Sequence, residues 1–340
     1  MARPRIYFPG TLWQFYDFAR PILEPACEIV VEPERVYSAE ETATVFAGVE
    51  GAILTAFEKV PRSVIEAAPR LRALSKYGVG IEAIDLEAAT ERGIPVTNTP
   101  GANSLGVAEH TVALILSLLR QVPQLDRLVR ADRWNDGRRL IGGDVEGSTL
   151  GLAGFGSIGQ LVGRRAGALG MRVIAYDPFQ SDETVAAAGA ERVAQLDDLL
   201  AASDVVSLHM SVTAETRRLF NAERFSRMKP GALFVNTARA ALVDQDALIA
   251  ALRERHLAGA ALDVFEPEPL APGGPLLDLD NVIITPHHAG TTVRTRERTL
   301  KQAATNLVRM LDGELPEIGL CNPSVRGRFE ARPGASVKPR

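Results

Sequence analysis

The stretch Leu150-Gly151-Leu152-Ala153-Gly154-Phe155-Gly156-Ser157-Ile158-Gly159 decides the fold of this chain. Its apolar half predicts a buried strand, and its spaced glycines predict a turn that leads into a small-residue helix over residues 161–170. A second apolar run, Met171 to Tyr176, ends at Asp177. Strand, glycine turn, helix, strand and acid, in this order, are typical of a βαβ unit that binds a dinucleotide.

Each residue of the turn has a separate expected role. Gly154 permits the tight turn, Gly156 lets a pyrophosphate approach the backbone, and Gly159 lets helix and strand pack closely. The free N–H groups of Ser157 and Ile158 point at the phosphates, and the helix dipole favours their charge. The sequence therefore predicts a phosphate-binding turn rather than an ordinary glycine-rich loop.

The acid at the end of the second strand predicts which dinucleotide binds. Asp177 lies 18 residues beyond Gly159, where a carboxylate can accept both ribose hydroxyls of NAD. The same carboxylate would repel the 2′-phosphate of NADP, and the next residues, Pro178-Phe179-Gln180-Ser181, include no Arg to bind it. We therefore predict NAD as the cofactor.

Composition restricts the class of protein. A chain of 340 residues is long for one core, so two domains are expected. The net charge of −4 gives no reason to expect nucleic acid or an anionic membrane as a partner. Cys27 and Cys321 lie far apart without metal-ligand spacing, so we expect reduced thiols and no metal site. No signal-peptide core and no apolar span of roughly 18 residues occur, so a cytoplasmic enzyme is expected.

Short apolar runs alternate with helical stretches over the first hundred residues, which predicts a small α/β domain with a parallel sheet. The expected strands are residues 6–8, 27–31, 52–55, 73–77 and 95–97, and the expected helices are 11–24, 38–49, 61–69 and 87–92. The loop Lys76-Tyr77-Gly78-Val79-Gly80 follows one strand. Its backbone N–H groups could hold an anion, although the loop taken alone is better explained as a plain strand-to-helix turn.

The segment from Pro100 to Ser104 breaks the chain and marks the expected crossing between domains. A helix from Val107 to Leu119 follows, on which Glu109 and His110 could each be structural or functional. Residues 123–148 are polar and predict an irregular arm, of a kind used for dimer contact or for bordering a site, with Trp134 as a packing anchor.

The α/β alternation resumes after Asp177. Strands are expected at 204–209, 232–236, 258–264 and 282–285, and helices at 196–202, 222–228 and 244–255. Ligands of an open parallel sheet bind beyond the carboxyl ends of its strands. The polar residues at those ends are therefore the candidate site residues: His209, Thr237, Arg239, Asp263, Glu268 and His287.

Three of these residues suggest a chemistry. The fork of Arg239 suits a carboxylate or a polarised carbonyl. A carboxylate beside a His fixes the ring tautomer, which suits a proton donor and acceptor near neutral pH. Spacing alone does not decide between His287 and His288, nor between Glu268 and Glu266.

These residues lie in motifs that resemble the D-isomer-specific 2-hydroxyacid dehydrogenase family, which includes phosphoglycerate dehydrogenase and hydroxypyruvate and glyoxylate reductases. The resemblance covers residues 50–323 well and the first 50 loosely. Its motifs are GFGSIG at 154–159, NTARAALVD at 236–244, ALDVFEPEP at 261–269 and TPH at 285–287.

The resemblance implies the roles of individual residues. Arg239 would orient the substrate carboxylate and carbonyl, and Glu268 would pair with His287, which resolves both ambiguities. The amides of Val79 and Gly80 would bind the substrate carboxylate. Beyond the glycine turn and Asp177, the implied cofactor contacts are His209, Met210, Thr237, Ala238, Asp263, His287 and Gly290.

The resemblance also implies the architecture. We expect two Rossmann-like α/β domains: a flavodoxin-like substrate domain of residues 1–102 plus 291–323, and an inserted, doubly wound NAD domain of residues 103–290. The active site would lie in the cleft, closed by hinge motion. Residues 324–340 are expected to be a disordered tail. A homodimer built on the NAD domain is expected.

The expected activity is NAD-dependent interconversion of a small (2R)-hydroxy acid and a 2-oxo acid. Departures from the family pattern at Glu82-Ala83, Ala240 and Ser211 leave Arg239, Glu268 and His287 in place. An NAD(H)-sensing corepressor-like protein would keep the same three residues and is the alternative. The formate dehydrogenase branch has Gln at the position of Glu268, which argues against that branch.

Overall fold

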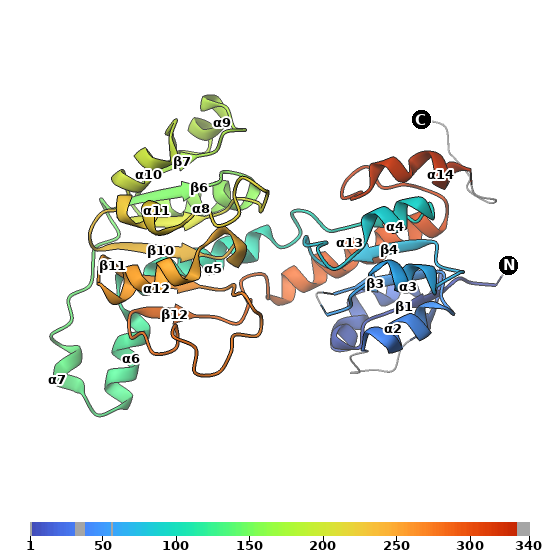
Figure 1. Cartoon of the computed structure of the whole chain (residues 1–340), viewed down its shortest axis with the longest axis horizontal. Helices are drawn as coiled ribbons and strands as arrows, with labels where there is room; N and C mark the ends of the chain where they lie inside the picture. Colours follow the sequence, from blue (N-terminus) through green and yellow to red (C-terminus); the bar gives the residue numbers. More distant parts are fainter. Residues whose placement is uncertain (1, 31–37, 56, 332–340) are drawn as a thin grey trace. The chain divides into compact units, whose positions relative to one another are not determined.

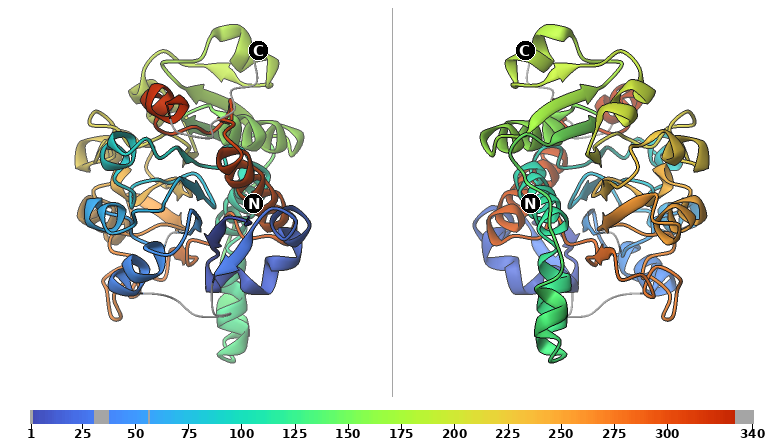
Figure 2. Two further views of the ribbon diagram at one scale, coloured as in Figure 1. Left: turned by 90° about the vertical axis from the view of Figure 1, so that its right-hand side faces the viewer. Right: turned by 90° about the vertical axis from the view of Figure 1, so that its left-hand side faces the viewer.

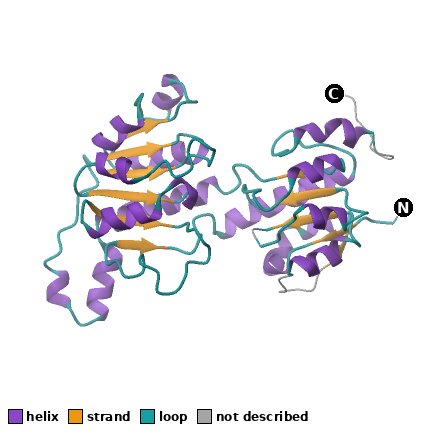
Figure 3. Ribbon diagram, in the orientation of Figure 1, coloured by secondary structure: helices purple, strands orange, loops and turns teal. Residues whose placement is uncertain are grey.

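The computed structural model describes residues 2–30, 38–55 and 57–331. The chain divides into two compact units (Figure 1): unit 1 comprises residues 1–103 and 292–340, and unit 2 comprises residues 104–291. Each unit has its own sheet with helices on both faces (Figure 3). Val31, the last residue of an expected strand, lies outside the described residues.

Unit 1 is built on a five-stranded sheet whose paired strands all run parallel. The strands are β1 (Arg5–Tyr7), β2 (Glu28–Val30), β3 (Gly51–Leu54), β4 (Ala73–Lys76) and β5 (Val96–Thr97). The helices are η1 (Gly10–Phe18, a 3-10 helix), α1 (Arg20–Leu23), α2 (Ala39–Phe46), α3 (Arg62–Glu66), α4 (Leu86–Glu91), α13 (Val293–Leu311), η3 (Pro323–Val325) and α14 (Arg326–Glu330). The strand order β2-β1-β3-β4-β5 is the flavodoxin-like order that was expected.

Two apolar layers cover the sheet of unit 1. One contains buried residues of α2, α3 and α4, and the other contains buried residues of η1, α1 and α13. The hydroxyl of Ser75 in β4 donates to the carbonyl of Ala303 in α13 at 2.8 Å, inside the protein. The helix α13, although it comes late in the sequence, therefore packs directly on the sheet formed by the N-terminal strands.

Unit 2 is built on a seven-stranded parallel sheet. The strands are β6 (Thr149–Ala153), β7 (Arg172–Tyr176), β8 (Glu191–Arg192), β9 (Val205–Leu208), β10 (Ala232–Asn236), β11 (Leu257–Leu262) and β12 (Val282–Ile284). The helices are α5 (Ser104–Leu119), α6 (Val122–Arg130), α7 (Trp134–Gly137), α8 (Ser157–Ala168), α9 (Asp182–Ala187), α10 (Leu196–Ala202), α11 (Ala222–Arg227), η2 (Ala240–Leu242, a 3-10 helix) and α12 (Gln245–Arg253).

The order of these strands locates the expected ligand edge. The sheet reads β12-β11-β10-β9-β6-β7-β8, so the winding reverses between β6 and β9. This is the Rossmann order with one added strand, and its ligands bind at the reversal point. Buried residues of α5, α8 and α9 fill one face, and those of α10, α11 and α12 fill the other. The predicted fold class is thereby confirmed for both units.

The arm at residues 123–148 differs from the prediction of an irregular segment. It contains the helices α6 and α7, which Figures 1 and 2 show extending away from the sheet of unit 2. No residue of α6 is buried, and Trp134 is 62% exposed. The expectation that Trp134 is a packing anchor is therefore wrong within the single chain, because the helices project instead of folding back.

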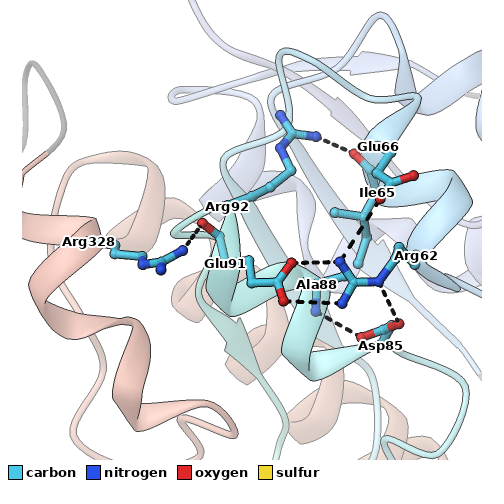
Figure 4. A network of polar contacts seen from close by, with 8 residues as sticks. All are labelled: Arg62, Ile65, Glu66, Asp85, Ala88, Glu91, Arg92 and Arg328. Carbon is cyan, nitrogen blue, oxygen red and sulfur yellow. Dashed lines mark hydrogen bonds and ion pairs between the residues drawn. The ribbon is translucent and has the colours of Figure 1, made fainter.

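The C-terminal segment also differs from its prediction. Residues 324–331 were expected to be disordered, but they form the end of η3 and α14, and Phe329 is buried. The cause is docking onto unit 1 (Figure 4): the guanidinium of Arg328 donates to the carbonyl of Glu91 at the end of α4, whose carboxylate pairs with Arg62 of α3. Residues 332–340 lie outside the described residues.

No single helix among the described residues has both the length and the apolar character needed to cross a membrane. α5 and α6 meet this requirement only when taken together, and the chain bends by 61° between them.

The docked C-terminal segment should stabilise unit 1. We expect Phe329→Ala to lower the free energy of unfolding of unit 1 by about 3 kcal/mol, because it leaves a cavity under α14. A Trp134→Phe background leaves Trp13 of unit 1 as the only tryptophan, so its fluorescence during urea unfolding reports on unit 1. Phe57→Ala, at a 65% exposed phenylalanine of the same unit, is the matched control and should change stability by less than about 0.5 kcal/mol. Equal midpoints for both variants would contradict a stabilising role for α14.

Candidate active site

The glycine turn after β6 is fixed by close backbone contact. Gly154 has φ +94°, and a Cβ on it would lie 2.6 Å from both the carbonyl carbon of His209 and the amide nitrogen of Met210. Neither backbone atom can move without shifting the end of β9. Only glycine therefore fits at this position.

The other glycines of the turn shape a surface suited to a phosphate. A Cβ on Gly159 would lie 2.6 Å from the carbonyl oxygen of Gly154, so helix and turn are in direct contact. Gly156 has nothing within 4 Å of its Cβ position, which leaves open space above the backbone. α8 begins at Ser157, and its N-cap residue, Gly156, has no side chain to cap the first amides. The residues present therefore fit the diphosphate of a dinucleotide.

Asp177 is held beside this turn. Its Oδ2 accepts the backbone N–H of Phe155 at 2.8 Å, and its Oδ1 accepts that of Phe179 at 2.9 Å. An ionised carboxylate has about four acceptor positions, so capacity remains for two ribose hydroxyls. Asp177 thus links the glycine turn to the end of β7.

His209 lies beneath the turn as a neutral side chain. Burial lowers the pKa of His209 to about 3, so its imidazole carries no charge at neutral pH. Its Nε2 lies 3.0 Å from the hydroxyl of Ser207. Met210 follows and packs its side chain against the core of unit 2. Both residues are thus placed where β9 ends, next to Gly154.

Arg239 is presented by a turn after β10. The side-chain amide of Asn236 donates to the carbonyl of Arg239 at 2.9 Å, and its oxygen accepts the N–H of Ala238 at 3.0 Å. The hydroxyl of Thr237 lies 2.8 Å from that of Thr111 on α5. Thr111 was not predicted as part of the site. In the sequence, Thr111 stands out only as a polar residue within an apolar helix. This pattern predicts that it is buried with a hydrogen-bond partner, but it does not identify that partner.

Glu268 and His287 form a pair. The Nδ1 of His287 lies 2.8 Å from the Oε2 of Glu268, and the other carboxylate oxygen accepts the N–H of Phe265 at 2.9 Å. The side chains of His287 and Glu268 are 52% and 37% exposed, respectively. Glu266 is exposed, and the backbone of His288 donates to Asp263 instead. The geometry thus pairs Glu268 with His287 among the four residues that spacing left open.

Asp263 holds the turn that carries His287. It is fully buried, and its carboxylate accepts the hydroxyl of Thr285 and the N–H groups of His288 and Ala289. Gly290 follows in the same turn. The Nε2 of His110 lies 3.3 Å from the hydroxyl of Thr285, so a residue that the sequence left undecided belongs to this cluster.

The loop with Val79 and Gly80 belongs to unit 1, where it follows β4. The carbonyl of Val79 accepts the side-chain amide of Asn98, and Gly78 bonds through both backbone groups to Thr99. No acceptor for the N–H of Val79 or Gly80 is present among residues 2–30, 38–55 and 57–331. These two amides could therefore receive an anion.

Comparisons with known proteins found one matching family profile and several similar chains. The family profile described as "D-isomer specific 2-hydroxyacid dehydrogenase, NAD binding domain" matches residues 112–289. A glyoxylate reductase of Thermofilum pendens is 37% identical over 343 residues, covering 99% of each chain. A D-3-phosphoglycerate dehydrogenase of Archaeoglobus fulgidus is 40% identical over 87% of this chain and 57% of its own. Among solved structures, the TT0316 protein of Thermus thermophilus superposes with a TM-score of 0.83 at 39% identity, covering 93% of this chain and 99% of the other.

The contact between Gly154 and the end of β9 should be essential for NADH binding. We expect Gly154→Ala to weaken NADH binding at least about tenfold, because the new Cβ forces the turn away from His209. Gly167→Ala, in α8 with nothing within 4 Å, is the matched control and should bind NADH normally. Quenching of protein fluorescence by NADH measures both affinities. Normal binding by Gly154→Ala would show that the turn tolerates a side chain.

Proposed function

The chain belongs to the D-isomer-specific 2-hydroxyacid dehydrogenase family, and on this premise we propose that it interconverts a (2R)-hydroxy acid and a 2-oxo acid. It is an NAD-dependent oxidoreductase of hydroxy and oxo acids. The observation that carries the finer proposal is the 2.8 Å contact between Glu268 and His287. We assign NAD binding to unit 2 and substrate binding to unit 1.

His287 is the proposed acid–base residue. Because its Nδ1 faces the carboxylate of Glu268, Nδ1 carries the proton of that hydrogen bond and Nε2 remains available. In the oxidation direction, Nε2 takes the proton of the substrate hydroxyl. In the reduction direction, the protonated ring returns it to the carbonyl oxygen, while Glu268 balances the charge of the imidazolium.

Arg239 is the proposed carboxylate ligand of unit 2. Its guanidinium can donate two parallel hydrogen bonds to a carboxylate, which fixes the orientation of the 2-oxo group. In unit 1, the amides of Val79 and Gly80 are proposed as donors to the substrate carboxylate. This assignment is supported by the lack of any acceptor for these amides among the described residues.

NAD, when bound, supplies the acceptor for the substrate's hydride. Gly154, Gly156 and Gly159, with the amides of Ser157 and Ile158, would hold its diphosphate, and Asp177 its adenosine ribose. The other residues proposed to contact it are His209, Met210, Thr237, Ala238, Asp263, His287 and Gly290.

The direct test is NADH oxidation with glyoxylate, hydroxypyruvate, pyruvate, phosphohydroxypyruvate and longer 2-oxo acids, with NADPH in parallel. Glyoxylate and phosphohydroxypyruvate follow the relatives named glyoxylate reductase and D-3-phosphoglycerate dehydrogenase. We expect turnover of at least one acid, with NADH preferred because Asp177 repels a 2′-phosphate. Tight NADH binding without turnover of any acid would favour the NAD(H)-sensing alternative.

On the acid that is turned over, His287→Ala should reduce kcat by about 10²- to 10⁴-fold, since it removes the proposed proton carrier. NADH affinity should change little. His288→Ala is the matched control, because its side chain is exposed and adjacent, and it should keep most of the activity. Equal activity of His287→Ala and the wild type would remove His287 from the mechanism.

We further propose that the chain forms a homodimer through the arm of α6 and α7. The arm presents large apolar side chains that are about half exposed or more: Val122, Val129, Trp134 and Ile141. Exposed apolar patches of this kind mark protein interfaces. A second copy would bury them against its own unit 2.

Trp134 should be central to that interface. We expect Trp134→Asp to weaken dimerisation by roughly 30-fold or more, which sedimentation velocity over a concentration series would measure. Phe179→Asp is the matched control, because Phe179 is 92% exposed and lies outside the arm. A monomeric wild type, or an unchanged dimer in Trp134→Asp, would refute this interface.

A further inference from the structure

His110 on α5 has no part in the proposed chemistry, yet it lies against the turn that carries His287. Its Nε2 is 3.3 Å from the hydroxyl of Thr285 and 3.8 Å from the Oδ1 of Asp263. Its side chain is 23% exposed. Besides burial, the electrostatic effect of His288 lowers the pKa of the His110 imidazole.

The direction of these hydrogen bonds follows from their geometry. The hydroxyl of Thr285 lies 2.5 Å from the Asp263 carboxylate, so its one proton goes to that charged acceptor. Its oxygen can then only accept from His110, whose Nε2 must carry a proton. Burial lowers the pKa of the His110 imidazole, Asp263 raises it and His288 lowers it, and the net lowering favours the neutral ring. The contact with Thr285 then places the proton of that ring on Nε2. The chain of donors therefore runs from His110 through Thr285 to Asp263.

The receiving carboxylate determines the shape of the turn. Asp263 accepts the N–H groups of His288 and Ala289 at 2.8 Å each. Between Thr285 and His288, the backbone of His287 takes φ +51°, in the left-handed region that a non-glycine residue rarely adopts. Such a conformation persists only where the surrounding contacts over-determine it. The orientation of Asp263 is thus linked directly to the position of the His287 backbone.

We propose that His110 is a positioning residue for proton transfer: through Thr285 it orients Asp263, and thereby keeps the His287 imidazole aligned with Glu268. This inference rests on the proposed function, in which His287 is the acid–base residue. Because His110 acts through the turn that carries His287, its loss should lower kcat by a larger factor than it weakens NADH binding.

The first test compares His110→Leu with His110→Gln on the acid that the wild type turns over. Leucine removes the donor, and we expect kcat to fall roughly 10- to 100-fold because the imidazole is misplaced. Glutamine places an amide N–H near the position of Nε2 and should restore most of the loss. His256→Leu is the matched control, since His256 is also half-buried and its Nε2 lies 3.0 Å from a carbonyl, that of Phe225, away from the turn. Equal losses in His110→Leu and His110→Gln, or wild-type kcat in His110→Leu, would overturn the proposal.

A double-mutant cycle with Thr285→Val tests the order of the contacts. If His110 acts through Thr285, the double variant should lose little more than the more damaging single variant. Losses that multiply would show that the two residues act independently, which contradicts the proposed chain of contacts.

A readout without turnover separates this inference from the proposed function. Ring ¹⁵N shifts of His287 report its tautomer, and we expect the Nδ1–H form in the wild type and in His256→Leu. His110→Leu should show a mixture with the Nε2–H form. A wild type that reduces no 2-oxo acid would refute the proposed function, whereas an unchanged His287 tautomer in His110→Leu would refute the positioning role.

Discussion

The structure of unit 2 depends on one geometric constraint: every pair of neighbouring strands in its sheet runs parallel. The carboxyl ends of all strands therefore lie at one edge, and the loops that leave them are neighbours whatever their separation in sequence. This is how Gly154 comes to contact His209, and how Asp263 after β11 reaches the backbone beyond β12. The buried strands thus bring the proposed site residues of unit 2 to one edge of the sheet.

Local signals made part of this edge predictable. The glycine turn and Asp177 lie within one βαβ unit, so the sequence contains strand, turn, helix and acid in the order in which they meet in space. The fold class followed from the same alternation. The two-residue strand β8 was not predicted, because Glu191–Arg192 is polar and forms only an edge.

The pair of Glu268 and His287, which we propose to be catalytic, was less predictable because its partners come from two irregular loops. Nothing in the spacing of Glu266 and Glu268, or of His287 and His288, specifies which side chains face each other. The left-handed backbone at His287 turns these neighbours in different directions, and a histidine in a sequence does not by itself indicate this conformation. His110 and Thr111 present a related difficulty. Buried polar residues on an apolar helix need hydrogen-bond partners, and the identity of those partners depends on the tertiary fold. The C-terminal segment was misjudged because its polar composition conceals Phe329, which is buried on unit 1.

In the turn at residues 285–289, a buried charge fixes the position of the backbone. A carboxylate as buried as Asp263 would be costly if its oxygens lacked donors, since water cannot reach them. Here three donors, from Thr285, His288 and Ala289, satisfy it, and two of them belong to the backbone beside His287. Any displacement of that backbone would remove hydrogen-bond donors from a buried charge, so moving it costs a large free energy. The left-handed conformation of His287 is thus maintained by the same electrostatic requirement that stabilises Asp263, and the proposed acid–base ring can remain half exposed without losing its alignment.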